Sequence, residues 1–136
     1  MMHVTKRVEF CAAHRYYHAE WTEEENRRRF GKAVGLHGHN YQLEVTVEGV
    51  PDPDTGMVMD LKALKDLITD AVLNDLDHRN LNEDVPDLNG QIPTPENLAV
   101  CIWERLTPRL VDCRLARVRL TEEAGYSVEF YGEYRP

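Results

Sequence analysis

Residues 37–48 have the sequence His-Gly-His-Asn-Tyr-Gln-Leu-Glu-Val-Thr-Val-Glu, in which apolar and polar side chains alternate. Side chains of an extended strand point to its two faces in turn, so this pattern predicts a strand of an antiparallel sheet with one face solvated. On that alternation His37 and His39 share the apolar face with Tyr41, Leu43, Val45 and Val47, while Asn40, Gln42, Glu44, Thr46 and Glu48 take the polar face.

The segment from Val4 to His14 follows the same alternation. Val8, Phe10 and Ala12 fall on the side of His14, and Arg7, Glu9 and Cys11 fall on the other. A buried imidazole without a partner is costly, and three imidazoles on inward faces are most economically satisfied by one shared cation. Three histidines suit Zn²⁺ with its fourth position open, the arrangement of a catalytic site. The sequence therefore predicts that His14, His37 and His39 bind zinc.

Size and composition narrow the classes of protein. The 136 residues predict one domain, 1–136, which is small for an enzyme that must enclose a substrate alone, so we expect self-assembly. The absence of a long uncharged apolar run predicts no membrane span and no secretory leader, and hence a soluble cytoplasmic protein. A formal net charge of -8 argues against a nucleic-acid binder. The basic run Arg27-Arg28-Arg29 is expected to be a solvated helical face rather than an anion site.

Three widely spaced cysteines predict neither a disulfide framework nor a thiolate zinc site. The other elements follow from helical and strand periodicities and from capping and turn residues. The expected elements are a short helix or ordered insertion over 19–29, a turn over 50–56 leading to a short strand over 57–59, helices over about 61–75 and 94–110, and strands near 115–121 and 126–131. This order predicts an α+β fold, ββααββ, in which a four-stranded antiparallel sheet carries both helices on one face.

Three further segments could carry chemistry, and each has a plain structural alternative. Asp77 and His78 adjoin just past the first long helix, either as a turn cap beside a helix C-terminus or as a carboxylate that orients a proton carrier. The Thr94-Pro95-Glu96-Asn97 segment is primarily a helix start. The pair Glu122-Glu123 could simply face solvent.

Seven blocks occur in order along the chain: Phe10-Cys11-Ala12-Ala13-His14, Phe30-Gly31-Lys32, His37-Gly38-His39-Asn40-Tyr41, Asp54 to Asp60, Leu76-Asp77-His78, Pro93 to Asn97, and Tyr131-Gly132-Glu133. Together they make the chain resemble the 6-pyruvoyl-tetrahydropterin synthase family, which includes bacterial 6-carboxytetrahydropterin synthase. The resemblance spans nearly the whole chain. It implies a tunnelling fold (T-fold), with barrels of subunits stacked as a dimer of trimers, a homohexamer, and active sites between subunits.

The resemblance also implies roles for individual residues. His14, His37 and His39 match the zinc ligands, and Asp77 and His78 match the pair that moves protons alongside a cysteine. Glu122 matches the glutamate that anchors the pterin ring, and Thr94 and Glu96 lie in a segment that lines the pterin pocket. The implied substrate is 7,8-dihydroneopterin triphosphate, converted by loss of triphosphate or by side-chain cleavage.

One position departs from the family. Relatives carry a cysteine where this chain has Ala33, and alanine offers no proton acceptor. Cys11 is expected to point away from the metal and not to replace the thiol. Three hypotheses therefore stay open: a 6-pyruvoyl- or 6-carboxytetrahydropterin synthase that uses His78 or a metal-bound hydroxide as base, a variant that cleaves the side chain for folate or deazapurine (queuosine) synthesis, and a pterin-binding protein with little turnover.

Overall fold

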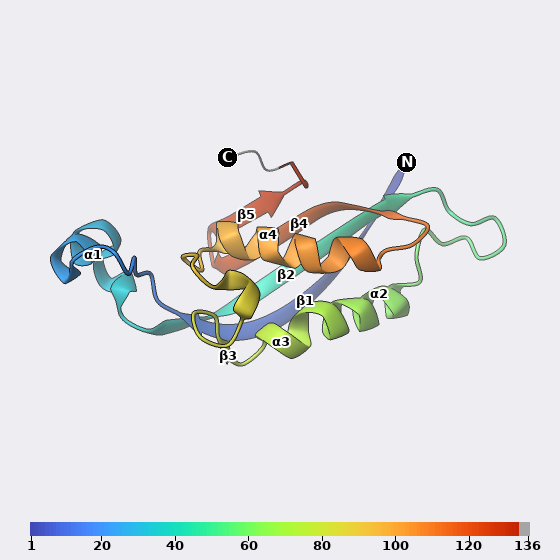
Figure 1. The fold of residues 1–136 in the computed structure, drawn as a ribbon. Coiled ribbons are helices and arrows are strands. Elements are labelled where there is room, and N and C mark those ends of the chain that lie inside the picture. Colours follow the sequence, from blue (N-terminus) through green and yellow to red (C-terminus); the bar gives the residue numbers. More distant parts are fainter. Residues whose placement is uncertain (134–136) are drawn as a thin grey trace.

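The computed structural model describes residues 1–133 and contains one five-stranded sheet (Figure 1). Its strand order is β3-β1-β2-β4-β5. Four strands are antiparallel neighbours: β1 Met2–His14, β2 His37–Gly49, β4 Arg114–Glu123 and β5 Tyr126–Phe130. The fifth, β3 Arg79–Asn80, pairs with β1 in parallel. The predicted four-stranded antiparallel sheet is therefore corrected to a mixed five-stranded sheet. β3 was not predicted because a strand of two residues has no periodicity that the sequence could show.

The helices occur in three regions of the described chain. α1 Glu23–Phe30 lies between β1 and β2 and continues into a 3₁₀ turn, Gly31–Val34. One longer helix combines α2 Leu61–Ile68, a π turn Thr69–Leu73 and α3 Asn74–Leu76, followed by the 3₁₀ turn Pro86–Leu88. α4 Pro95–Leu106 ends in the 3₁₀ turn Thr107–Arg109. The predicted order ββααββ is therefore wrong in detail, since α1 and β3 interrupt it. Within residues 1–133 no helix is both long and apolar enough to cross a bilayer.

The short strand expected over 57–59 does not form. The carboxylate of Asp52 accepts the backbone N–H groups of Asp54 and Thr55, at 2.7 and 3.2 Å, and closes the segment into a turn. β2 also has no free edge near this segment, since its end pairs with β1 on one side and with β4 on the other. A strand over 57–59 therefore could not pair with β2, the strand that it directly follows.

Both long helices pack on one face of the sheet, as predicted (Figure 1). The core joins the apolar side chains of β1, β2 and β4 to those of α2 and α4. Its fully buried members include Tyr41, Leu43, Val45, Val47, Leu64, Ile68, Leu98, Ile102 and Leu120. The opposite face is polar, with the Thr5 and Thr46 hydroxyls 2.7 Å apart and Glu44 pairing with Arg117 and Arg119. We call these the helix face and the open face.

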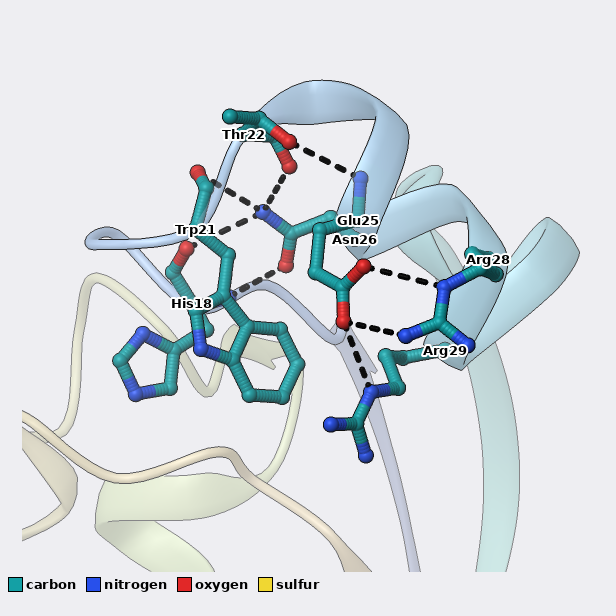
Figure 2. A network of polar contacts seen from close by, with 7 residues as sticks. All are labelled: His18, Trp21, Thr22, Glu25, Asn26, Arg28 and Arg29. Carbon is teal, nitrogen blue, oxygen red and sulfur yellow. Dashed lines mark hydrogen bonds and ion pairs between the residues drawn. The ribbon is translucent and has the colours of Figure 1, made fainter.

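The segment between β1 and β2 stands out from the sheet and is ordered by its own contacts (Figure 1). At its centre Asn26 is 1% exposed, and its side-chain amide bonds the backbone of His18, Trp21 and Thr22 (Figure 2). The Glu25 carboxylate accepts from both Arg28 and Arg29 (Figure 2). Two of the three arginines in the basic run are thus neutralised locally, as expected of a solvated helical face rather than an anion site.

Arg105 of α4 joins α4 to the π turn that precedes Asp77. Its guanidinium donates to the Ala71 carbonyl at 3.0 Å, to Asp75 at 2.6 Å and to Asp87 at 2.7 and 2.8 Å. Replacing Arg105 by Met keeps the apolar stem but leaves these acceptors without their charged donor. We expect the free energy of unfolding to fall by about 1–3 kcal/mol, measured by urea denaturation at fixed protein concentration.

Arg109→Met is the matched control for this prediction. Arg109 pairs with Asp70 at 2.7 Å, but the side chains are 45% and 64% exposed. Solvent weakens such a pair, so its loss should change the unfolding free energy by less than about 1 kcal/mol. Equal losses in the two variants would show that Arg105 does not hold the π turn.

Candidate metal centre

The three predicted histidines converge at one end of the sheet. His14 ends β1 and lies opposite His37, the first residue of β2, while His39 lies two residues further along β2 on the same face. One ring nitrogen from each lies within 4.8 Å of the others. His14 is fully buried, whereas His37 and His39 are half-buried. The histidine cluster therefore has a closed inner side and a side that opens toward solvent.

Backbone carbonyls fix the orientation of two of these rings. Nδ1 of His14 donates to the Pro93 carbonyl at 2.8 Å, and Nδ1 of His37 donates to the Gly35 carbonyl at 2.8 Å. A carbonyl can only accept, so each Nδ1 carries the proton and each Nε2 presents a lone pair. Such a second contact is typical of metal-binding histidines. Pro93, which directly precedes the N-cap of α4, thereby orients the His14 ring at the end of β1.

Burial keeps His14 neutral. It lowers the pKa of His14 to about 4, even though the hydrogen bond to the Pro93 carbonyl acts in the opposite direction. His14 Nε2 is buried and has no hydrogen-bond partner in the described part of the chain. A buried lone pair without a donor is unfavourable, and a cation at this point would satisfy it.

Glu122 faces the histidine cluster directly. Its Oε1 lies 3.3 Å from His14 Nε2 and 3.2 Å from His39 Nε2, and within residues 1–133 it accepts no hydrogen bond. Glu122 is 8% exposed, and burial raises the pKa of its carboxyl. Lone pairs of oxygen and nitrogen at this distance repel each other unless a proton or a cation lies between them. The donor set of three imidazoles and one carboxylate fits Zn²⁺.

The sequence left two alternatives for Glu122, exposure to solvent or a contact with the pterin ring, and neither indicated its burial against His14 and His39. A signal existed, because Val118, Leu120 and Glu122 alternate with Arg117, Arg119 and Thr121. The alternation places Glu122 on the helix face, the face that His14, His37 and His39 share.

Further polar groups surround the cluster. Burial raises the pKa of Tyr16, and the nearby carboxylates of Glu122 and Glu96 raise it further. Tyr126 has a raised pKa because of burial and of Glu96, which it contacts. Thr94 caps α4, its hydroxyl accepting from the Asn97 N–H at 3.2 Å, and this confirms the segment as a helix start. Thr94 thus directly follows Pro93, whose carbonyl bonds His14, and Glu96 lies in the first turn of α4 and is exposed.

Asp77 and His78 are in direct contact with each other. His78 Nδ1 lies 3.0 Å from Asp77 Oδ1, and the same oxygen accepts the Cys11 N–H at 2.9 Å. Burial raises the pKa of Asp77, but the bonds from Cys11 and His78 outweigh it and leave the pKa below its usual value. His78 has a φ of 62°, in the left-handed region. Asp77 is also the C-cap residue of α3, so its position at a helix end is confirmed, while a role of the pair in proton transfer stays a prediction.

The Asp77–His78 pair and the histidine cluster form two separate groups. Cys11 belongs with the former, because the ligand atoms of Cys11, Asp77 and His78 lie within 4.8 Å of one another. Cys11 pairs with Asn40 in the sheet, and both lie on the open face, opposite His14. The sequence correctly predicted that Cys11 points away from the histidines. It did not predict the contact with Asp77, because that contact joins segments 66 residues apart.

Position 33 lies beside the histidine cluster. The Ala33 carbonyl accepts the Tyr16 N–H at 2.8 Å, and the Tyr16 ring lies 5.0 Å from the His14 ring. The main chain of residue 33 is thus joined to Tyr16, a neighbour of His14, and the methyl group of alanine can neither accept nor donate a proton.

Comparison with known proteins identifies the family. The sequence model described as 6-pyruvoyl tetrahydropterin synthase matches residues 3–133. The chain belongs to this family. The chain is 41% identical over 130 residues to the 6-pyruvoyl tetrahydrobiopterin synthase of Dictyostelium discoideum, covering 96% of each sequence. It is 40% identical over 124 residues to the dihydroneopterin monophosphate aldolase of Pyrococcus furiosus, covering 90% of this chain and 91% of the relative.

A solved synthase structure shares the fold. The 6-pyruvoyl tetrahydropterin synthase of Caenorhabditis elegans superimposes with a TM-score of 0.91 at 32% identity, over 97% of this chain and 96% of that chain. Membership of the synthase family and its α+β fold are therefore confirmed.

Proposed function

We propose that this member of the synthase family is a zinc-dependent lyase that acts on 7,8-dihydroneopterin triphosphate as a 6-pyruvoyl- or 6-carboxytetrahydropterin synthase. The observation that carries the proposal is the histidine cluster, in which the unpartnered Nε2 of His14 and Oε1 of Glu122 face each other. The relatives named as synthases match almost the whole chain, which supports this reaction class.

Each residue of the cluster has a defined part in this proposal. His14, His37 and His39 would hold the metal, with two rings fixed by the Pro93 and Gly35 carbonyls. When bound, zinc would supply a Lewis acid that stabilises negative charge on a substrate oxygen. The half-buried side of His37 and His39 leaves room for that oxygen to approach.

Carboxylates beside the cluster suit a pterin ring, whose amino and ring N–H groups are donors. Glu122 remains a candidate for this contact, but its Oε1 already faces His14 and His39. Glu96 is exposed, so its carboxylate can accept from a ring bound beside it in addition to its contact with Tyr126. Thr94 accepts a backbone N–H, which leaves its hydroxyl proton free to donate. We therefore place the ring nearer to Glu96 and Thr94 than to Glu122.

Proton transfer is assigned to Asp77 and His78. The Asp77 carboxylate faces the Nδ1–H of His78, so Nε2 of the same ring is free to exchange a proton. The sheet separates this pair from the histidine cluster of the same chain. We therefore propose that the pair of one copy serves the metal of a neighbouring copy, within the expected homohexamer and in the cytoplasm.

The second candidate function is cleavage of the pterin side chain. It is favoured by Ala33, which removes the expected thiol from the edge of the histidine cluster. The Pyrococcus relative, which is named an aldolase, supports it as well. Both reactions begin with removal of a proton from the substrate, and they differ in the bond that breaks next.

Product analysis tests the proposed function. Zinc-loaded protein is incubated with 7,8-dihydroneopterin triphosphate, and the products are identified by mass spectrometry. We expect release of inorganic triphosphate together with a 6-pyruvoyl or 6-carboxy tetrahydropterin. A 6-hydroxymethyl pterin would instead establish the aldolase-type reaction, and unchanged substrate bound to the protein would show a pterin-binding protein.

A further inference from the structure

Cys11 lies in a hollow on the open face of the sheet. The hollow measures about 610 Å³, and its floor is formed by Cys11, Ala13, Gly38 and Asn40, which pair across β1 and β2. A side chain on Gly38 would place its Cβ 3.2 Å from the Ala12 carbonyl oxygen, a tight contact. Small residues therefore keep the surface around the half-buried Cys11 thiol open.

The walls of the same hollow carry the groups that could act on this thiol. His78, Arg79 and Asp84 line it, and Asp77 lies behind His78. Two hydrogen bonds hold the segments together: the His78 N–H donates to the Cys11 carbonyl at 2.7 Å, and the Cys11 N–H donates to the Asp77 carboxylate at 2.9 Å. The first joins the two main chains, and the second fixes the Asp77 side chain on the main chain of Cys11.

We propose that Cys11, Asp77 and His78 form one acid–base centre in which the Cys11 thiolate removes the substrate proton. This proposal rests on the proposed function and supplies the base that Ala33 cannot provide. In the first step the Cys11 S–H proton passes to His78, which becomes an imidazolium balanced by the Asp77 carboxylate. In the second step the thiolate accepts the proton from substrate carbon, and the electron pair of that C–H bond stays with the substrate.

Two features of the chain support this assignment. A Cys–His–Asp arrangement is a recognised way to activate a thiol, with the carboxylate orienting the imidazole. Within residues 1–133 the Cys101 thiol donates to Asp87 and the Cys113 thiol to Met59 Sδ, and neither cysteine is grouped with a histidine as Cys11 is. Burial raises the pKa of Cys101 to about 12, with a further contribution from Asp87, and the pKa of Cys113 is raised by burial and by Asp112.

Alkylation tests the thiol without any substrate. Native protein is treated with iodoacetamide between pH 6 and pH 8, and mass spectrometry follows the modification of each cysteine. We expect Cys11 to react at least 10-fold faster than Cys101 and Cys113, and this advantage to disappear in the His78→Asn variant. In denaturant all three thiols should react alike. A Cys11 rate that does not depend on His78 would overturn the proposal.

Turnover tests the role of the thiol in the reaction. Cys11→Ser should lower kcat by about 10²-fold or more at unchanged zinc content, and adding Ala33→Cys to it should restore part of the loss. Wild-type kcat in Cys11→Ser would overturn the proposal. A thiolate-to-metal absorption band in cobalt-loaded protein would also overturn it, because Cys11, Asp77 and His78 would then be a metal site. If the wild type forms no product at all, the proposed function fails, while the alkylation result still decides whether Cys11 and His78 are paired.

Discussion

Replacing His39 by Ala should abolish stoichiometric zinc binding and lower turnover on 7,8-dihydroneopterin triphosphate by about 10³-fold or more. The variant removes one of the three predicted ligands and leaves Glu122 facing only His14. Because the His39 side chain is only 17% exposed, its truncation leaves a cavity at the end of the sheet, so circular dichroism and the free energy of unfolding are measured to check that the variant is folded. Zinc is measured per chain by elemental analysis after dialysis, and kcat by product formation.

His3→Ala is the control for this variant. His3 also contacts a buried glutamate, Glu48, at 2.8 Å, but it lies near the other end of β1 and is 60% exposed. It should keep one zinc per chain and the wild-type kcat. If His39→Ala also retained one tightly bound zinc, the histidine cluster would not be the metal site.

Replacing His78 by Asn should lower kcat by about 10²–10⁴-fold and leave zinc binding unchanged. Asparagine is chosen because His78 has a φ of 62°, a conformation that Asn tolerates better than Ala. Its side-chain amide can still donate to Asp77, so the local structure is kept while the group that exchanges protons is lost. Single-turnover kinetics with zinc-loaded protein measure the chemical step separately from product release.

His18→Asn is the control. It makes the same substitution at a histidine that lies elsewhere, in the ordered segment between β1 and β2. His18 stacks on Trp21 at 4.5 Å and lies in neither group of candidate site residues (Figure 2). Its kcat should stay within about threefold of wild type, since the half-buried His18 ring lies outside both groups. A His78→Asn protein with the wild-type rate would remove His78 from the mechanism.

The sequence was informative where strict alternation applies. The parity of His14, His37 and His39 correctly placed three rings on one face, and the same rule places Glu122 there. The helices were predictable because capping residues Asp60 and Thr94 precede apolar stripes, and both residues cap their helices in the structure.

Contacts between distant segments were not predictable in this way. β3 has two residues and is defined only by its pairing with β1. The contact of Cys11 with Asp77 depends on that pairing, so no local pattern indicates it. The strand expected over 57–59 failed for a related reason, because whether a strand forms depends on a free edge that sequence alone does not show. The zinc, the homohexamer and the pterin contacts stay predictions.

Subunit mixing tests most directly whether the metal centre of one copy works with the Asp77–His78 pair of another. His39→Ala and His78→Asn proteins, each nearly inactive, are dissociated together, reassembled and checked for hybrids by native mass spectrometry. If sites form between copies, random hybrids contain intact sites, and activity should recover to about a quarter of wild type. Hybrids that remain as inactive as their parents would contradict this arrangement.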